Sequence, residues 1–192
     1  PSTGRMGYAI ARELLARGAH VTCIHGPTPL APPKEAENRA VVSASEMAKE
    51  VHSLLPGKDA LIMCAAVADW TPASPASEKQ EKSEHAIELP LVRTPDILKD
   101  TASISGPLRI GFAAQTDGLK DRAQAKLRAK HLDLIVANPI GGEGAGFAAP
   151  TNEGWLFFRD GSEMAIPRCS KAEFARVLVD EVTQLLEDKR SE

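Results

Sequence analysis

The sequence is poor in aromatic residues, and this scarcity limits what the protein can bind. Phenylalanine, tryptophan and tyrosine make up 4% of the chain, too few for a platform on which successive bases of a single strand stack. The formal net charge is -3, whereas nonspecific binding to nucleic acids or anionic membranes favours a basic surface. We therefore expect neither a nucleic-acid partner nor a membrane partner.

Cysteine is also scarce. The chain has three cysteines, Cys23, Cys64 and Cys169, and no two of them have the C-x-x-C spacing. An odd number, with Cys23 and Cys64 inside apolar segments, indicates reduced thiols that serve as small core residues in the cytoplasm. A catalytic thiol is the alternative. The five histidines are scattered without the spacing of metal ligands, so no protein metal site is predicted.

Long apolar runs are absent too. No run reaches the ~18 residues that a membrane-spanning helix needs. The chain shows neither a signal peptide nor an initiating methionine, which predicts a processed, excised or truncated chain. Its 192 residues are enough for one domain with its own core, and no internal repeat is visible. We predict a single domain over residues 1–192.

What the sequence does contain is an alternation of helical and strand patterns. Met6, Ile10 and Leu14 recur every fourth residue, which predicts a helix that ends at Gly18. Ser43 and Glu46 form a capping box for a second helix. The alternation predicts an α/β fold, a Rossmann-like three-layer mostly parallel sheet with helices on both faces. The predicted strands of the main alternation are 19–26, 40–44, 59–70, 108–114 and 132–138.

Three segments depart from this alternation. Residues 68–85 are rich in proline, serine and charge, which predicts a long functional loop, and 86–92 alternates as a strand. Residues 154–158 and 163–167 flank an Asp-Gly turn and predict an antiparallel hairpin. Thr94 is the expected N-cap of a short helix. Further helices are predicted over 117–130 and after the capping residues Ser170 and Glu173.

Ligands of open α/β sheets bind at the carboxyl ends of the strands. The opening "STGRMG" has small residues that let backbone N–H groups approach an anion at a helix N-terminus, although a plain tight turn is the alternative. It lacks the full G-x-G-x-x-G spacing, and the following strand ends in His25 and Gly26 rather than in an acidic residue. These departures disfavour a nicotinamide dinucleotide site. The candidate ligand loops are 2–7, 26–33, 66–82, 113–117 and 138–149.

Three further segments carry groups suited to a nucleotide. "CAAVADW" places Asp69 just after a buried strand, and "EKQEK" places Lys79 and Lys82 in the long loop, where they could close over phosphates. "KLRAK" places Lys126 and Lys130 on one helix face, where an anionic ligand would relieve their repulsion. A solvated loop or an ordinary solvent-facing surface is the alternative in each case.

Taken in order, these segments resemble one family. "STGRMG", "CAAVADW", "EKQEK", "TPDIL", "GFAAQT" and "KLRAKHLDLIVAN" are similar to segments of the phosphopantothenate–cysteine ligases, also called phosphopantothenoylcysteine synthetases. This synthetase domain is often fused behind a flavin-dependent decarboxylase in bacteria, so FMN would belong to that domain and not to this one. The resemblance extends from residue 1 to the last predicted helix.

The resemblance implies a function in coenzyme A biosynthesis. CTP, with Mg²⁺, would activate the carboxylate of 4'-phosphopantothenate as an acyl-cytidylate, and the amine of L-cysteine would then displace CMP. Two rivals differ in class: an NAD(P)-dependent oxidoreductase and a non-catalytic nucleotide-binding module. A closer rival keeps the ligase but replaces CTP by ATP.

The resemblance also assigns residues. Lys79 would be catalytic, acting on the phosphates or on the activation transition state, although Glu81 stands where the family usually has a lysine. Asp69 would hold the cytidine, Phe112 would pack on the nucleotide, and Lys126 and Lys130 would contact the triphosphate. The remaining nucleotide-binding positions are Met63, Cys64, Ala65, Pro95, Asp96, Ile97 and Leu98, and the phosphate loop is formed by Ser2, Thr3, Gly4, Met6 and Gly7.

Finally, the resemblance bears on the chain's first residue and on assembly. In the family a strand and an asparagine precede the opening loop, so we expect this chain to lack its first strand and one catalytic residue. A homodimer is implied as well, paired through 83–93 and the 153–167 hairpin.

Overall fold

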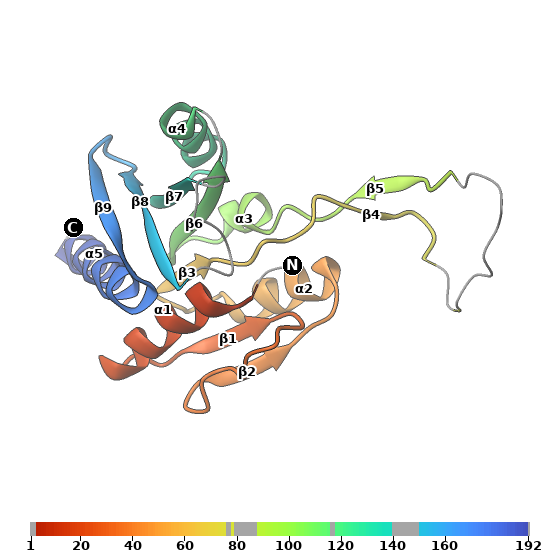
Figure 1. Cartoon of the computed structure of the whole chain (residues 1–192), viewed down its shortest axis with the longest axis horizontal. Helices are drawn as coiled ribbons and strands as arrows, with labels where there is room; N and C mark the ends of the chain where they lie inside the picture. Colours follow the sequence, from red (N-terminus) through yellow and green to blue (C-terminus); the bar gives the residue numbers. More distant parts are fainter. Residues whose placement is uncertain (1–2, 76–77, 79–87, 116–117, 140–149, 192) are drawn as a thin grey trace.

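The structure is a computed structural model, and it describes residues 3–75, 78, 88–115, 118–139 and 150–191. Helices and strands alternate along most of the chain (Figure 1). The helices are α1 (Arg5–Ala16), α2 (Ala44–Leu54), α3 (Ile97–Asp100), the short 3-10 helix η1 (Thr101–Ser103), α4 (Leu119–Ala129) and α5 (Lys171–Ser191). The strands are β1 (Thr22–His25), β2 (Glu37–Ala40), β3 (Ala60–Met63), β4 (Trp70–Pro72), β5 (Leu91–Arg93), β6 (Leu108–Gln115), β7 (Leu134–Pro139), β8 (Thr151–Phe158) and β9 (Glu163–Ser170).

The main sheet has five strands in the order β3-β6-β7-β8-β9. Strands β3, β6 and β7 are parallel, whereas β8 and β9 form the antiparallel hairpin predicted from the Asp-Gly turn. Strands β1 and β2 form a separate parallel pair, and β4 and β5 an antiparallel pair. The predicted Rossmann-like, mostly parallel α/β fold is confirmed. The predicted strand before residue 1 stays a prediction.

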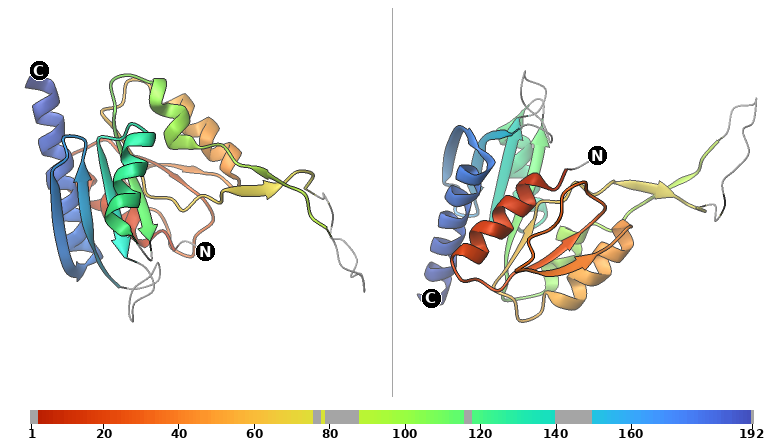
Figure 2. Two further views of the ribbon diagram at one scale, coloured as in Figure 1. Left: turned by 90° about the horizontal axis from the view of Figure 1, so that it is seen from above. Right: turned by 60° about the horizontal axis from the view of Figure 1, so that its bottom comes forward.

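Helices cover both faces of the main sheet (Figure 2). On one face, side chains of α1 and α5 pack with Ile110, Leu134 and Val136, which are buried. On the other face, α3 and α4 pack with the intervening residues Ala113 and Ile135. Because successive strand residues point to opposite faces, β6 and β7 contribute to both cores. Helix α2 completes the second outer layer through a cluster that includes Met47, Val51 and Ile97.

Three sequence predictions about individual elements are wrong. The strand predicted at 40–44 lies at Glu37–Ala40, where every residue is exposed and no apolar alternation exists to reveal it. The run 59–70 is not one strand, because β3 ends at Met63 and β4 begins at Trp70, inside the predicted loop. Thr94 is not the N-cap of α3. Its hydroxyl donates to the Ala68 carbonyl at 2.5 Å, and Asp96 caps the helix instead.

Strands β4 and β5 form an arm that extends away from the layered body (Figures 1 and 2). Trp70 pairs with Arg93 in the ladder, and the Arg93 guanidinium lies 4.9 Å from the centroid of the Trp70 ring. The part of the predicted 86–92 strand that precedes Glu88 lies outside the described residues. Among the helices that the structure describes, none combines the length and the apolar character needed to cross a membrane.

Candidate functional site at the carboxyl edge of the sheet

The carboxyl end of β3 forms the centre of the predicted site. Met63 is the last residue of β3 and pairs with Gly111, so Cys64 lies level with Phe112 of β6. The backbone leaves the sheet here, and Ala65 is exposed. Met63 is half-buried and packs against the cores beside α2, α3 and α4, whereas Cys64 packs on the opposite face. The predicted contact of Met63, Cys64 and Ala65 with a ligand stays a prediction, and of the three residues only Ala65 is exposed.

Lys126 of α4 and Lys130, the C-cap residue of that helix, lie on the side of this strand end that faces α3. Lys126 donates a hydrogen bond to the Phe112 carbonyl at 2.9 Å, and Lys130 pairs with Asp96 at 2.8 Å. Burial lowers the pKa of Lys126, and the neighbouring Lys130 charge lowers it further, while Asp96 and Asp69 act in the opposite direction. A positive charge in this position has incomplete compensation, so an anion bound beside it would be stabilised.

Asp96 connects these lysines to α3. Its carboxylate accepts from the Lys99 backbone N–H at 3.3 Å and from Lys130. Burial disfavours the ionised carboxylate, but the hydrogen bonds from Lys130 and from the Lys99 amide outweigh it and lower the pKa of Asp96. Pro95 is half-buried, while Ile97 and Leu98 are buried core residues. The buried side chains of Ile97 and Leu98 therefore anchor the first turn of α3 in the core. A ligand at this turn would contact its backbone and not these side chains.

Two other predicted residues occupy less direct positions. Asp69 is exposed, its carbonyl accepts from the Thr94 amide at 3.1 Å, and its charge acts on Lys126. The Phe112 side chain packs partly against the core on the α1 and α5 face, so its carbonyl, not its ring, is the group that reaches Lys126. Lys79 lies outside the described residues, as does Lys82.

The opening loop forms the other side of the site. Gly4 is the N-cap residue of α1 and has φ 73°, and as a glycine it supplies no side chain to cap the helix. A side chain at Gly4 would meet the Tyr8 ring at 3.0 Å in addition to the left-handed backbone. Gly7 faces β3, since a Cβ at Gly7 would lie 4.0 Å from the Cys64 Cβ. The first turn of α1 is thus positioned beside the strand end. Thr3 and Met6 are half-buried, and Ser2 lies outside the described residues.

Helix α5 begins at the same edge, which sequence reasoning missed. The Lys171 ammonium donates to the Thr151 carbonyl at 3.2 Å, and the Asn152 amide contacts the Met6 sulfur at 3.5 Å. Burial lowers the pKa of Lys171. Cys64 has a smaller effect that raises this pKa, and the Arg5 charge has a smaller effect that lowers it. Burial also raises the pKa of Cys64 to about 12, against the opposing Lys171 charge. The thiol is therefore protonated at neutral pH, which makes it a packing group and not a nucleophile.

The strand end is thus flanked on both sides by basic residues. Lys126 and Lys130 lie on the α4 side, and Arg5 and Lys171 on the side where α1 and α5 begin. Helix N-termini and ammonium groups around the end of a strand are the kind of groups that favour an extended anionic ligand, which makes this edge the candidate site. The fold and the position of these groups define the class, a Rossmann-like three-layer α/β protein with its candidate site at the carboxyl edge of the parallel strands.

Comparisons with known proteins agree with this class and narrow it. Residues 1–186 match the family described as the DNA/pantothenate metabolism flavoprotein C-terminal domain. The chain is 41% identical over 186 residues to the coenzyme A biosynthesis bifunctional protein CoaBC of Bacillus subtilis (strain 168), covering 96% of this chain and 46% of that protein. It is 40% identical over 198 residues to the CoaBC protein of Mycobacterium tuberculosis (strain ATCC 25618 / H37Rv), covering 96% of this chain and 47% of that protein. The chain thus spans about half the length of the curated relatives that it matches.

Solved structures give the same result. The crystal structure of the C-terminal domain of CoaBC is 34% identical, with a TM-score of 0.81, covering 97% of this chain and 85% of that one. The DNA/pantothenate metabolism flavoprotein from Streptococcus pneumoniae has the same fold, with a TM-score of 0.80 at 23% identity. This chain therefore belongs to the DNA/pantothenate metabolism flavoprotein C-terminal domain family. The family resemblance drawn from the sequence segments is confirmed.

Proposed function

We propose that the chain is a phosphopantothenate–cysteine ligase domain of coenzyme A biosynthesis that uses CTP. Family membership over residues 1–186 is the observation that carries the proposal. The CoaBC relatives are described as coenzyme A biosynthesis proteins, and the part of CoaBC similar in structure is its C-terminal domain. The basic groups on both sides of the β3 end support a substrate set that carries several phosphates.

The proposed reaction has two steps. A carboxylate oxygen of 4'-phosphopantothenate forms a bond to the α-phosphorus of CTP, and the bond from that phosphorus to pyrophosphate breaks. The amine of L-cysteine then forms a C–N bond to the acyl carbon and loses a proton, while the C–O bond to CMP breaks. The first step brings two anions together, so positioning and positive charge are what the protein must supply.

The described residues would divide these tasks. Backbone groups of Met63, Cys64 and Ala65 would contact the nucleotide, and Asp69 would accept hydrogen bonds from the cytidine. Lys126 and Lys130 would contact the triphosphate, and binding would replace the Lys130–Asp96 pair with phosphate contacts. The backbone from Pro95 to Leu98 would border the nucleotide beside Phe112. The phosphate loop, from Ser2 to Gly7, would hold the phosphate of 4'-phosphopantothenate at the α1 N-terminus.

Lys79 is the proposed catalytic residue. A lysine in a segment between β4 and β5 would approach the phosphates when the substrates are bound and would stabilise the charge that develops during activation. The sequence "EKQEK" and the family resemblance support this role.

Mg²⁺ would enter with CTP. Within the described part of the chain, no group of three or more His, Cys, Asp or Glu side chains could hold a metal ion. We propose that phosphate oxygens and water hold the ion, which is how Mg²⁺ commonly binds in nucleotide sites. The ion would neutralise phosphate charge. FMN would belong to a separate or fused decarboxylase. We place the reaction in the cytoplasm, which fits the three free thiols Cys23, Cys64 and Cys169.

We also propose that the chain acts as a homodimer through its arm. Several large apolar side chains of the arm are exposed, namely Trp70, Leu89, Leu91 and Val92. A second copy of the arm would cover them and would bring the adjoining loop to the partner's site.

Pyrophosphate release tests the function. The chain, with any upstream segment restored, is mixed with CTP, Mg²⁺, 4'-phosphopantothenate and cysteine, and pyrophosphate and the cysteine adduct are measured. We expect both products with CTP, adduct formation only with cysteine present, and much less of both with ATP. ATP working as well as CTP would contradict the choice of base. If neither nucleotide gives pyrophosphate, the ligase function is contradicted, and the non-catalytic nucleotide-binding module becomes the better interpretation. Reduction of NAD(P)⁺ would favour the oxidoreductase.

A further inference from the structure

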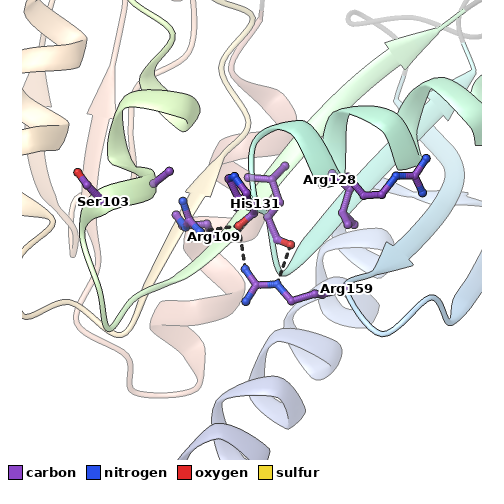
Figure 3. A pocket seen from close by; sticks show the side chains of 8 residues that line it. Ser103, Arg109, Arg128, His131 and Arg159 are labelled. Carbon is purple, nitrogen blue, oxygen red and sulfur yellow. Dashed lines mark hydrogen bonds between the residues drawn. The ribbon is translucent and has the colours of Figure 1, made fainter.

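A cationic groove lies at the opposite edge of the main sheet from the candidate ligase site. Its volume is about 840 Å³, and it is lined by residues that include Arg109, Arg128, His131 and Arg159 (Figure 3). Arg109 is near the amino end of β6, and His131 lies just before β7. The carboxyl ends of β3 and β6 carry the site described above, so this groove is separate from it.

Arg109 is the residue that makes the groove unusual. It is only 7% exposed, and its Nη2 group donates to the His131 carbonyl at 2.5 Å. Its Nη1 group is buried and has no hydrogen-bond partner among the described residues. A buried charged donor without a partner carries a large desolvation cost. Such a donor beside a groove is accounted for when an acceptor binds there.

The Arg159 guanidinium of the groove is also fixed in place. Arg159 donates to the His131 carbonyl at 2.8 Å and to the Leu132 carbonyl at 3.2 Å, and it pairs with Asp133 at 3.1 Å. The Asp133 carboxylate also accepts from the Arg109 amide at 2.7 Å. His131 has φ 51°, and this left-handed backbone presents its carbonyl to both arginines. The guanidinium groups are thus held by the backbone around His131.

The charge balance favours an anion. The residues that line the groove include three arginines and no acidic residue. Asp133 pairs with Arg159, and the charges of Arg109 and Arg128 remain without an ion pair in the described part of the chain. Guanidinium groups bind phosphate oxygens through two parallel hydrogen bonds, and a phosphate monoester can accept from more than one arginine.

We propose that this groove binds the phosphate group of a small phosphorylated molecule. The phosphate lies beside Arg109 and Arg159, Arg128 adds positive charge at the border of the groove, and the organic part lies along Leu127 and Leu132, which also line the groove. The volume is sufficient for a molecule of nucleotide size. The site is additional to the proposed ligase site and does not depend on it.

Phenyl phosphate and inorganic phosphate are suitable probes, with phenol as the neutral control. Two-dimensional ¹H–¹⁵N spectra of the chain would separate the two sites, because amides of Ser103, Arg109 and Arg159 report on the groove, and those of Gly4 and Ala65 on the carboxyl edge. We expect saturable shifts of the groove amides with both phosphates, tighter binding of phenyl phosphate, and no response to phenol. Shifts confined to the carboxyl edge, or equal shifts with phenol, would overturn the proposal.

Three variants test the named side chains. Arg128→Gln removes an exposed charge and should weaken phosphate binding at the groove by about fivefold or more. Arg109→Lys keeps the charge but removes the Nη1 donor, and we expect at least ~10-fold weaker binding. Arg12→Gln is the matched control, because Arg12 is exposed on α1 across the sheet. If Arg109→Lys fails to fold, Arg128→Gln decides alone, and unchanged groove affinity in that variant contradicts the site.

Discussion

At the scale of single residues, the environment of Lys126 supports its proposed role as a contact for the triphosphate. Its ammonium is half-buried, bonded to one carbonyl, and close to a second lysine. Burial is the largest cause of its lowered pKa. A phosphate oxygen beside Lys126 would offset both the cost of burying its charge and the repulsion from Lys130. The charged side chain would therefore stabilise an anion-bound state more than it stabilises the free protein.

Lys126→Gln should therefore weaken CTP binding. We expect the KM for CTP to rise by about tenfold or more, because a charge-assisted contact to the triphosphate is lost. Lys49→Gln removes an exposed lysine of α2 and is the matched control, expected to leave the KM unchanged. Steady-state pyrophosphate release measures both. An unchanged KM in Lys126→Gln would mean that this lysine supports β6 and does not contact the nucleotide.

Lys79→Gln should act on the chemical step instead. We expect pyrophosphate formation to fall by at least ~100-fold, which is about 2.7 kcal/mol of transition-state stabilisation. Thermal unfolding should be unchanged. The neighbouring substitution Lys82→Gln should cost much less, since Lys79 alone is assigned to the transition state. Near-normal turnover of Lys79→Gln would show an ordinary surface charge.

Cys64 predicts how stability depends on alkaline pH. Its pKa is raised by burial from 9.0 to about 12, so the folded chain retains a proton that the unfolded chain loses. This contribution is fully present below pH 9.0 and is lost as pH rises toward 12. Urea unfolding between pH 8 and pH 11 should show a falling free energy of unfolding, with a shallower fall in Cys64→Ala. If the free energy of unfolding falls equally steeply with pH in the unchanged chain and in Cys64→Ala, the raised pKa of Cys64 is contradicted. Cys64→Ala should retain ligase activity, because a protonated thiol is no nucleophile.

At the scale of elements, helices were easier to predict than strands. The capping box of Ser43 and Glu46 is present in full, and Ser170 and Glu173 cap α5 in the same way. These features are local, so the sequence contains all the information that they need. Strand β2 is exposed throughout and pairs with β1, and that long-range pairing leaves no period in the sequence. Thr94 was misread because its hydroxyl bonds to Ala68, 26 residues away.

In the candidate site, too, the residues marked by local sequence patterns were predicted, and those brought in by long-range pairing were not. The α4 lysines and the α3 N-terminus were predicted and lie beside the β3 end. Lys171 was missed because it follows an ordinary capping residue, and only the antiparallel return of β8 and β9 brings it to Thr151. The groove around Arg109 was missed for a similar reason, since its arginines come from a strand, a helix and a turn that are far apart in the sequence.

Ser170→Ala tests the element that carries Lys171. Loss of the hydroxyl that accepts from the Glu173 amide should lower the free energy of unfolding by about 1 kcal/mol. Ser53→Ala, at an exposed position inside α2, is the control and should change stability by less than ~0.5 kcal/mol. Urea unfolding gives both values. A cost as small as that of the control would mean that α5 is held by its core face alone.

At the scale of the whole molecule, the arm is the feature that the layered body does not explain. The body buries its apolar side chains between helices and sheet, whereas Leu91 of the arm is 50% exposed and Leu89 is 60% exposed. Isolated two-stranded ribbons are marginally stable in water. A second copy of the chain would supply the missing apolar contacts and would also order the arm.

Leu91→Lys should therefore disrupt the proposed homodimer. Sedimentation equilibrium should show a dimer for the unchanged chain and a shift toward monomer for the variant, because a charge would be buried in the interface. Leu30→Lys, at an exposed leucine of the β1–β2 loop, is the control and should remain dimeric. The circular dichroism spectrum of Leu91→Lys should be unchanged, since the arm lies outside the core clusters. A monomeric unchanged chain, or a dimer unaffected by Leu91→Lys, would show that the arm does not mediate self-association.

Pyrophosphate release by Leu91→Lys tests whether the partner's arm takes part in catalysis. If the dimer dissociates and pyrophosphate release falls with it, the partner's arm contributes to the site. If release persists in the monomer, each chain carries a complete site.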